Sequence, residues 1–229
     1  MAFSAPFQSV FRAPLGGGAA AAPAAWYNAG GAPNPVAAYR FKGAASYAAA
    51  KVNLVTPGTH DAVDGAAFPS WNAATGCAFD DTLSQYLTTD VVVAANAWTT
   101  IIQFANAAGN IWARLCGASD DWFVRYFFSW STGGAGASYR NGSVLVVAPV
   151  ITAGNLCMAG ATAYRDGVND GIIPVSAVPA AAQYIGAMNE AGAPMAGTFL
   201  TGDVIALAYY DVTLSAPQVA AVKATMAAF

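Results

Sequence analysis

The sequence predicts an all-β fold, a two-sheet antiparallel sandwich with an extended N-terminal arm and a short C-terminal helix. From residue 37 onward, short runs of β-branched and aromatic residues alternate with turn residues such as Gly, Asn, Asp and Pro. A convincing helical period occurs only near the C-terminus. We therefore divide the 229 residues into an arm with its linker, residues 1–36, and one sandwich domain, residues 37–229.

The predicted strands follow one another closely along the domain. Residues 76–81 and 85–89 are expected to form two strands around a tight turn, and Gly133-Gly134 and Asn141-Gly142 are typical of hairpin turns. The strand candidates in chain order are 37–41, 76–81, 85–89, 98–104, 111–116, 122–130, 137–140, 144–147 and 156–163.

The chain ends in a strand-like run, residues 202–210, a polar turn and a predicted helix. Ser215 can cap this helix and Pro217 falls in its first turn. The residues that share one face at helical spacing are Val219, Val222, Met226 and Phe229.

The arm has a different composition from the domain. Phe3, Phe7 and Phe11 recur at a spacing of four, and a Gly/Ala/Pro tract follows them. Two interpretations stay open: a disordered tail, or a docking peptide that buries the three rings in a partner protein.

Composition excludes several functional classes. Hydrophobic residues make up 56% of the chain, yet no window has the roughly 18 consecutive large apolar residues of a membrane span. The nine basic residues are scattered and the net charge is −3, so we expect no nucleic-acid partner. Only 9% of residues are charged, which suits a permanent assembly and predicts a homo-oligomer. No secretory leader is expected at the N-terminus.

The three cysteines, Cys77, Cys116 and Cys157, are odd in number and far apart. They have no Cys-x-x-Cys spacing, so buried free thiols are predicted in preference to a disulfide.

Four motifs precede the closing segment in a characteristic order: residues 76–87, 98–102, 164–168 and 184–187. Together with residues 202–229 they resemble the concanavalin A-like (laminin-G-type) jelly roll, which implies that fold for about residues 37–229. The arm, the Gly/Ala linker and the low charge are similar to those of phage virion proteins, in which a short aromatic segment precedes one such domain.

No catalytic site is predicted. Glycosidases with this kind of fold use two carboxylates, but the chain has one glutamate, Glu190, in a polar loop. Side chains of Asp80-Asp81 and of Asp120-Asp121 would point to opposite faces of an extended strand, so we expect turn and capping roles for both pairs. His60, the one histidine, has no nucleophile motif, and no metal site is predicted from it or from the cysteines.

Related lectin-like domains often hold calcium at the sheet rim, so the resemblance leaves calcium open as a cofactor. The conceivable ligands are Asp80, Asp81, Asp203 and Asn189, but they form no dense acidic loop, and no cofactor is the prediction.

The candidate carbohydrate-binding residues join aromatic rings to planar polar groups: Asp120, Trp122, Tyr139, Arg140 and Asn141. An alternative reading competes with this one. Trp122, Tyr126, Phe128 and Trp130 alternate along one predicted strand, which favours a role in the sandwich core or in a subunit contact.

The preferred hypothesis is a non-enzymatic structural protein of an extracellular virus particle, as a capsid decoration, fibre or tail component. Its arm would bind other virion proteins through Phe3, Phe7 and Phe11, and its domain would be lectin-like. The alternative is a carbohydrate-binding module for attachment to host or surface glycans, and a degenerate glycan hydrolase ranks third.

Overall fold

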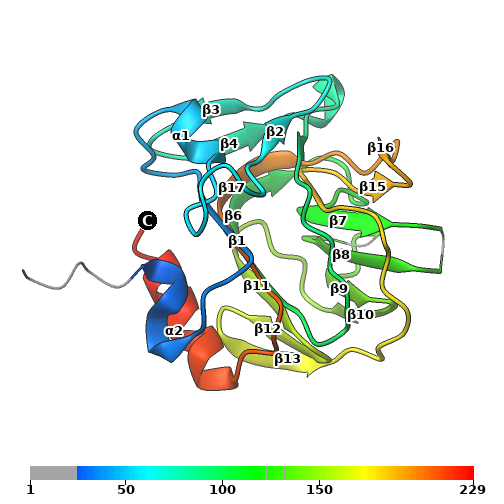
Figure 1. Cartoon of the computed structure of the whole chain (residues 1–229). Helices are drawn as coiled ribbons and strands as arrows, with labels where there is room; N and C mark the ends of the chain where they lie inside the picture. The colour runs from blue at the N-terminus through cyan, green and yellow to red at the C-terminus, as the bar shows by residue number, and fades with distance from the viewer. Residues whose placement is uncertain (1–24, 122, 132) are drawn as a thin grey trace, which may run out of the picture.

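The computed structural model describes residues 25–121, 123–131 and 133–229, and it is a two-sheet β-sandwich, as the sequence predicted (Figure 1). Sheet A has the order β13-β12-β11-β6-β17-β4-β3, with β1 also paired to β17. Its strands are β1 (Ala37–Arg40), β3 (Ser70–Asn72), β4 (Gly76–Phe79), β6 (Thr99–Ala108), β11 (Gly154–Ala159), β12 (Thr162–Arg165), β13 (Val168–Ile172) and β17 (Thr201–Tyr210).

Sheet B has the order β10-β9-β8-β7-β14-β5-β2, and β15 runs parallel to β7 at one edge. Its strands are β2 (Val63–Asp64), β5 (Leu87–Thr88), β7 (Cys116–Ser119), β8 (Arg125–Ser129), β9 (Ala137–Asn141), β10 (Ser143–Val147), β14 (Tyr184–Ile185), β15 (Asn189–Glu190) and β16 (Ala193–Pro194).

The hydrophobic core lies between the two sheets because side chains alternate between the faces of each strand. In sheet A, β6 and β17 run antiparallel and pair Ile102 with Leu207, both fully buried. In sheet B, Tyr126, Phe128 and Trp130 point to the same core. The prediction that the alternating aromatic residues of 122–130 belong to the sandwich core is therefore confirmed for these three residues. Trp122 lies outside the described residues.

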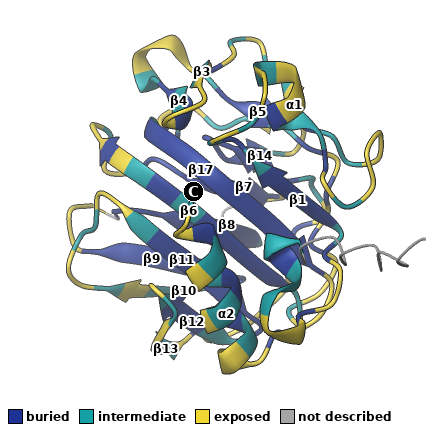
Figure 2. Cartoon of the chain, turned by 90° about the vertical axis from the view of Figure 1, so that its left-hand side faces the viewer, coloured by how far each residue is buried: buried dark blue, intermediate teal, exposed yellow. Residues whose placement is uncertain are grey.

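The outer face of sheet A is covered by α2 (Ala216–Met226). Val219, Val222 and Met226 are fully buried against residues such as Ile101 and Ala208 of the sheet, which confirms the predicted apolar face of the helix. The Ser215 backbone N–H donates to Gln218 Oε1, as a capping box requires. Figure 2 views this side of the molecule, where β17 is buried along almost its whole length.

Residues 25–36, which the sequence analysis placed in the linker, contact the same side of the domain. The short 3-10 helix η1 (Trp26–Gly31) lies beside α2 (Figure 1). Its Tyr27 carbonyl accepts a hydrogen bond from the Tyr210 hydroxyl at 2.7 Å, and the Trp26 carbonyl accepts one from Thr225 at 3.0 Å. Phe3, Phe7 and Phe11 lie outside the described residues.

Several expectations from the sequence differ from the structure in detail. Residues 76–81 and 85–89 do not form a hairpin: β4 and β5 belong to different sheets, and the turn after Asp80 is the 3-10 helix η2 (Asp81–Leu83). Residues 156–163 contain parts of β11 and β12, separated by Gly160 at φ +58°. The short helix α1 (Tyr47–Lys51), which Ser46 caps, was not predicted.

The predicted strand 111–116 is mostly a loop, and β7 begins only at Cys116. Asn110 forms a turn here, since its side chain accepts from the Trp112 N–H at 2.9 Å and its carbonyl accepts from the Ala113 N–H at 3.0 Å. No helix among the described residues is long and apolar enough to cross a membrane.

Candidate functional site

The outer face of β7–β10 in sheet B carries a row of basic and aromatic side chains. Tyr126 and Phe128 of β8 point into the core, so Arg125 and Phe127 point outward. On β9, Tyr139 belongs to the core, so the next residue, Arg140, also points outward. Phe127 and Arg140 are register partners, which places their side chains next to each other on this face.

Phe127 occupies its position because Gly117 lies beside it on β7. A Cβ atom at Gly117 would approach the Phe127 Cβ to 2.5 Å, which no real pair of side chains allows. The absence of a side chain at this point lets the Phe127 ring lie over β7, where it is only 3% exposed.

Around these residues is a hollow of about 360 Å³. Sheet B forms its floor, and two loops, around Trp112 and Met195–Thr198, form its sides. The residues that line it include Trp112, Arg114, Arg125, Phe127, Arg140, Val144, Val146, Met195 and Thr198. Such a combination of apolar walls with a few charged groups is typical of ligand sites.

Hydrogen bonds join the two side loops to each other. The Arg114 N–H donates to the Thr198 carbonyl at 2.8 Å, and Asn110 Nδ2 donates to the Gly197 carbonyl at 2.6 Å. The Thr198 hydroxyl in turn donates to the Met195 carbonyl at 2.7 Å. The walls are therefore fixed before any ligand enters, which reduces the entropy cost of binding.

Arg114 is a buried cation of the hollow, with 5% of its surface exposed. Its guanidinium carbon lies 4.1 Å from the centroid of the Phe127 ring, a cation–π contact. Its Nη1 donates to the Trp112 carbonyl and, at 3.3 Å, to the Ser129 hydroxyl oxygen. The Nε atom has no hydrogen-bond partner within the described part of the chain.

The other two arginines have different surroundings. Arg140 lies with its guanidinium carbon 6.0 Å from the Phe127 centroid, and its Nε donates to the Gly142 carbonyl at 2.8 Å. Arg125 is 3% exposed, and its Nη2 lies 3.8 Å from the Glu190 carboxylate. The charges of Glu190 and Asp121 both act on Arg125, so two acidic groups lie near this arginine.

The three positive charges affect one another. Burial, and then the charges of Arg125 and Arg140, lower the pKa of Arg114 to about 9. Burial also lowers the pKa of Arg125 and that of Arg140. In all three arginines, burial is the largest cause of the lowered pKa, because it disfavours the charged form.

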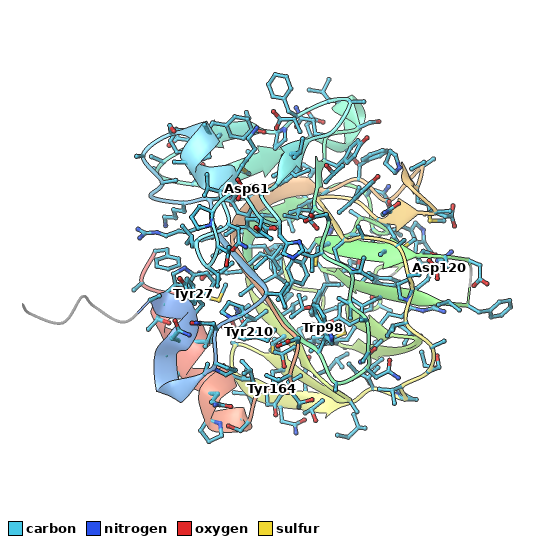
Figure 3. All side chains as sticks on the ribbon, viewed as in Figure 1. Tyr27, Asp61, Trp98, Asp120, Tyr164 and Tyr210 are labelled. Atoms are coloured by element: carbon cyan, nitrogen blue, oxygen red, sulfur yellow. The ribbon has the colours of Figure 1, made fainter. Side chains whose placement is uncertain are left out.

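Of the candidate carbohydrate-binding residues, the structure places Arg140 in the hollow. Tyr139 and Asn141, its neighbours on β9, are fully buried on the other face: Tyr139 Oη donates to Asp170 at 2.7 Å and Asn141 Nδ2 to the Gly160 carbonyl at 3.0 Å. Asp120 accepts from the N–H groups of Ala180 and Ala181, and Figure 3 shows it at the far right of the molecule. Trp122 lies outside the described residues.

The sequence analysis did not select Trp112, Arg114, Arg125 or Phe127 for the site. The sequence could have indicated two of them. Arg125 and Phe127 alternate with the core residues Tyr126 and Phe128, which predicts that they lie on the outer face of the same strand. The loop residues Trp112 and Arg114 had no such signal, since residues 111–116 were assigned to a strand.

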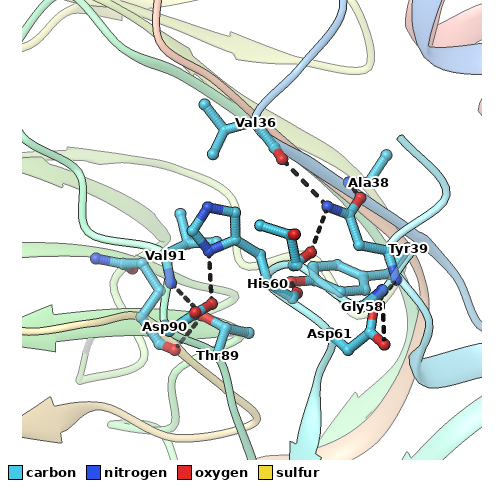
Figure 4. Close-up of polar contacts among 12 residues, drawn as sticks. Val36, Ala38, Tyr39, Gly58, His60, Asp61, Thr89, Asp90 and Val91 are labelled. Carbon is cyan, nitrogen blue, oxygen red and sulfur yellow. Dashed lines mark hydrogen bonds and ion pairs between the residues drawn. The ribbon is translucent and has the colours of Figure 1, made fainter. Parts of the chain in front are cut away.

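A second hollow, of about 350 Å³, surrounds His60. Its Nδ1 lies 2.6 Å from Asp90 Oδ1, and its backbone carbonyl accepts a hydrogen bond from the Tyr39 hydroxyl (Figure 4). The Thr89 hydroxyl, which also lines this hollow, donates to the Gln183 carbonyl at 2.7 Å. The Thr89 hydroxyl is therefore not a free nucleophile for His60. The contact between His60 and Asp90 joins the loop of residues 58–61 to residues 88–90.

Three of the four conceivable calcium ligands have other hydrogen-bonding roles, and the fourth, Asp81, is the first residue of η2. Asp80 caps η2 through the Thr82 N–H, and Asp203 accepts from Asn106 Nδ2 at 2.6 Å on β17 of sheet A. Asn189 on sheet B is hydrogen-bonded to Ala182 and Gly192. No group of three or more metal-ligating side chains occurs among the described residues.

Other predicted roles agree with the structure. Cys77, Cys116 and Cys157 are buried free thiols, as predicted, and burial raises the pKa of each of them. Asp121 forms the expected turn, since its carboxylate accepts from the N–H groups of Phe123 and Val124 at 2.6 and 2.8 Å, and these bonds lower its pKa.

The fold is similar to that of solved sialidase structures. The Trypanosoma rangeli sialidase in complex with 2,3-difluorosialic acid aligns with a TM-score of 0.57 at 15% identity, over 83% of this chain and 33% of the sialidase. Another structure of that sialidase gives a TM-score of 0.52 at 13% identity, with the same coverage. The present chain thus spans about a third of the sialidase's length.

A weaker similarity exists to domain 4 of AbnA, an extracellular GH43 arabinanase from Geobacillus stearothermophilus, in complex with arabinotriose. The TM-score is 0.46 at 14% identity, over 83% of this chain and 98% of that domain. No family model matches the sequence, and no curated protein matches it. At these identities the comparisons show the all-β sandwich fold alone.

Proposed function

We propose that this chain is a non-catalytic carbohydrate-binding module whose sugar site is the hollow on the outer face of sheet B. The observation that carries this proposal is the hollow itself, where the Trp112 and Phe127 rings lie beside the polar groups of Arg114, Arg140 and Thr198. Aromatic rings cover the apolar faces of sugars, and planar polar groups bind their hydroxyls. The sugar-derived ligand in the similar sialidase structure agrees with this proposal.

A glycan array with the full chain tests the proposal, and we expect binding to a defined set of sugars. Trp112→Ala should abolish this signal, because half of the Trp112 side chain is exposed at the hollow. Phe68→Ala is the matched control, since Phe68 is also an exposed aromatic residue, at 61%, but lies elsewhere. Absence of sugar binding by the wild type, or equal loss in both variants, would contradict the proposal.

The non-catalytic part of the proposal depends on Glu190, the one glutamate of the sequence. Its carboxylate lies 3.8 Å from Arg125, whereas a glycosidase of the usual kind needs two carboxylates that flank the scissile bond. We expect the wild type to release no sugar from any glycan that it binds. Hydrolysis by the wild type that disappears in Glu190→Gln would overturn this part.

The virion role remains a prediction from the sequence. It depends on Phe3, Phe7 and Phe11, which lie outside the described residues, and the similar solved structures named above give it no support. The predicted homo-oligomer and the extracellular-particle location rest on the same sequence arguments.

A further inference from the structure

We propose that the sheet B hollow binds the free end of a glycan chain, with the end sugar beside β7 and the rest of the chain leaving over the β10 edge. This inference rests on the proposed sugar-binding function and names the part of a glycan that the site takes. It follows from the order of the strands under the hollow, the position of its walls and the exposure of its lining residues.

The floor of the hollow runs across the strands of sheet B. On the outer face, Phe127 of β8 is the register partner of Arg140 on β9, and Arg140 is in turn the register partner of Val144 on β10. Gly117 of β7 pairs with Phe127 on its other side. These four residues form one cross-strand row from β7 to β10, which is the edge strand of the described sheet.

The loop of residues 195–198 closes the β7 end of this row. β14 and β15 pair with β7 on the side away from β8, and Met188 directly precedes β15. The Met195 N–H donates to the Met188 carbonyl at 2.8 Å, and the Arg114 N–H donates to the Thr198 carbonyl at 2.8 Å. Hydrogen bonds therefore hold both ends of the loop beyond β7, where it forms a fixed wall.

The second loop closes the hollow along the strand direction. Ser129, the last residue of β8, donates through its hydroxyl to the Ala113 carbonyl at 2.7 Å, which places the neighbouring Trp112 at this end of the strand. A Cβ atom at Gly133 would lie 3.4 Å from the Trp112 ring, so the ring reaches the loop between β8 and β9. A chain that ran along the strands would meet this ring.

The β10 end of the row is open. Phe127 and Thr198, near β7, are each 3% exposed. Val144 and Val146 of β10 are 45% and 40% exposed, and β9 is the only described strand that pairs with β10. The hollow is therefore deep and walled at one end, and shallow and exposed at the other.

This asymmetry determines which part of a glycan fits. A sugar within a chain has a neighbour on each side, and one neighbour would have to pass through a wall that hydrogen bonds hold in place. A sugar at the end of a chain has a neighbour on one side, so it can fill the deep part while the next sugar contacts the aliphatic side chains of β10. The hollow therefore suits a chain end and not an internal segment.

The experiment compares matched pairs of array glycans with the full chain. In one member of each pair a sugar sequence stands at the free end, and in the other the same sequence is extended at that end by one different sugar. We expect the wild type to bind the end form at least about tenfold more tightly, a difference of about 1.4 kcal/mol, because the added sugar would meet the wall. A cyclic glycan of the same sugars, which has no end, should bind as weakly as the extended form.

Val144→Asn tests the exit over β10, and Val168→Asn is its matched control. Val168, at 70% exposure, lies on β13, the edge strand of sheet A. The free monosaccharide and disaccharide of a bound chain end would compete with the array glycan. We expect Val144→Asn to lower the ratio of disaccharide to monosaccharide affinity about threefold, because the second sugar loses an apolar contact, and Val168→Asn to keep the ratio. Thermal unfolding verifies that both variants are folded.

The possible failures are distinguishable. Absence of binding to every array glycan would contradict the sugar-binding function itself. Equal or tighter binding of the extended or cyclic forms would overturn the inference of end recognition but leave the sugar-binding function intact. An unchanged affinity ratio in Val144→Asn, or an equal fall in Val168→Asn, would overturn the exit over β10.

Discussion

The two sheets of the sandwich share one core, but their outer faces have opposite surroundings. The outer face of sheet A carries small and apolar side chains such as Ile101, Cys157 and Ala208, and α2 with η1 covers them. The outer face of sheet B carries Arg125, Phe127 and Arg140, and the described segments at the sides of its hollow are loops. The difference indicates that sheet A stabilises the domain on both of its faces, whereas sheet B leaves one face available for a ligand.

The chemistry of each outer face has a physical reason. Alanine and cysteine permit close approach of a helix to a sheet, and burial of the apolar stripe of α2 stabilises the pair. Arginine and phenylalanine on sheet B cover each other through cation–π contacts, so this face needs no helix to shield its aromatic ring. The Phe127 ring and the arginine side chains line the proposed binding site.

The largest expected contrast is in thiol reactivity. Cys157 lies under α2 on the outer face of sheet A, and burial raises the pKa of its thiol. We expect Ellman's reagent to modify Cys157 more slowly, by orders of magnitude, than a cysteine introduced by Val144→Cys on the open face of sheet B, where Val144 is 45% exposed. Rapid reaction of Cys157 in the native wild type would show that α2 does not close sheet A.

The second contrast is in the cost of a buried charge. Val222→Asp places a carboxylate under α2, where Val222 is fully buried, and should lower the free energy of unfolding by about 3 kcal/mol or more. Val146→Asp, on the open face at 40% exposure, should change it by less than about 1 kcal/mol. Urea unfolding monitored by tryptophan fluorescence measures both. Similar losses in the two variants would remove the distinction between the faces.

A smaller effect is expected at the contact between η1 and the sheet. Tyr210→Phe removes the hydrogen bond from the Tyr210 hydroxyl to the Tyr27 carbonyl, and it should cost about 1–2 kcal/mol. Figure 3 labels both residues. The same urea titration detects the loss. An unchanged free energy of unfolding would mean that residues 25–36 contribute little to the covering of sheet A.

The sequence was sufficient to predict the fold class and the closing elements. Two patterns are local in the sequence and are therefore visible without a structure. They are the period-two alternation of residues 122–130 and the apolar helical face of Val219, Val222 and Met226. The strand pairing of β4 and β5 was wrong, because a tight turn in the sequence does not reveal that the chain crosses from one sheet to the other.

The binding site was only partly predictable. Arg140 was selected because it lies near turn residues, but its neighbours Tyr139 and Asn141 alternate to the core face. Arg114 and Trp112 reach the hollow from a loop whose path is fixed by long-range hydrogen bonds from Arg114 to Thr198 and from Asn110 to Gly197. Contacts between residues more than 80 positions apart leave no local pattern in the sequence.

The central claim is that ligand binds to the open face of sheet B, and methyl NMR tests it directly. A protein labelled at valine and methionine methyl groups would be titrated with a glycan that binds on the array. The account predicts that the largest shift changes occur at Val144, Val146 and Met195, which line the hollow, with little change at Val219, Val222 and Met226 under α2. Larger changes at the α2 methyl groups, or at Val63 beside His60, would contradict it.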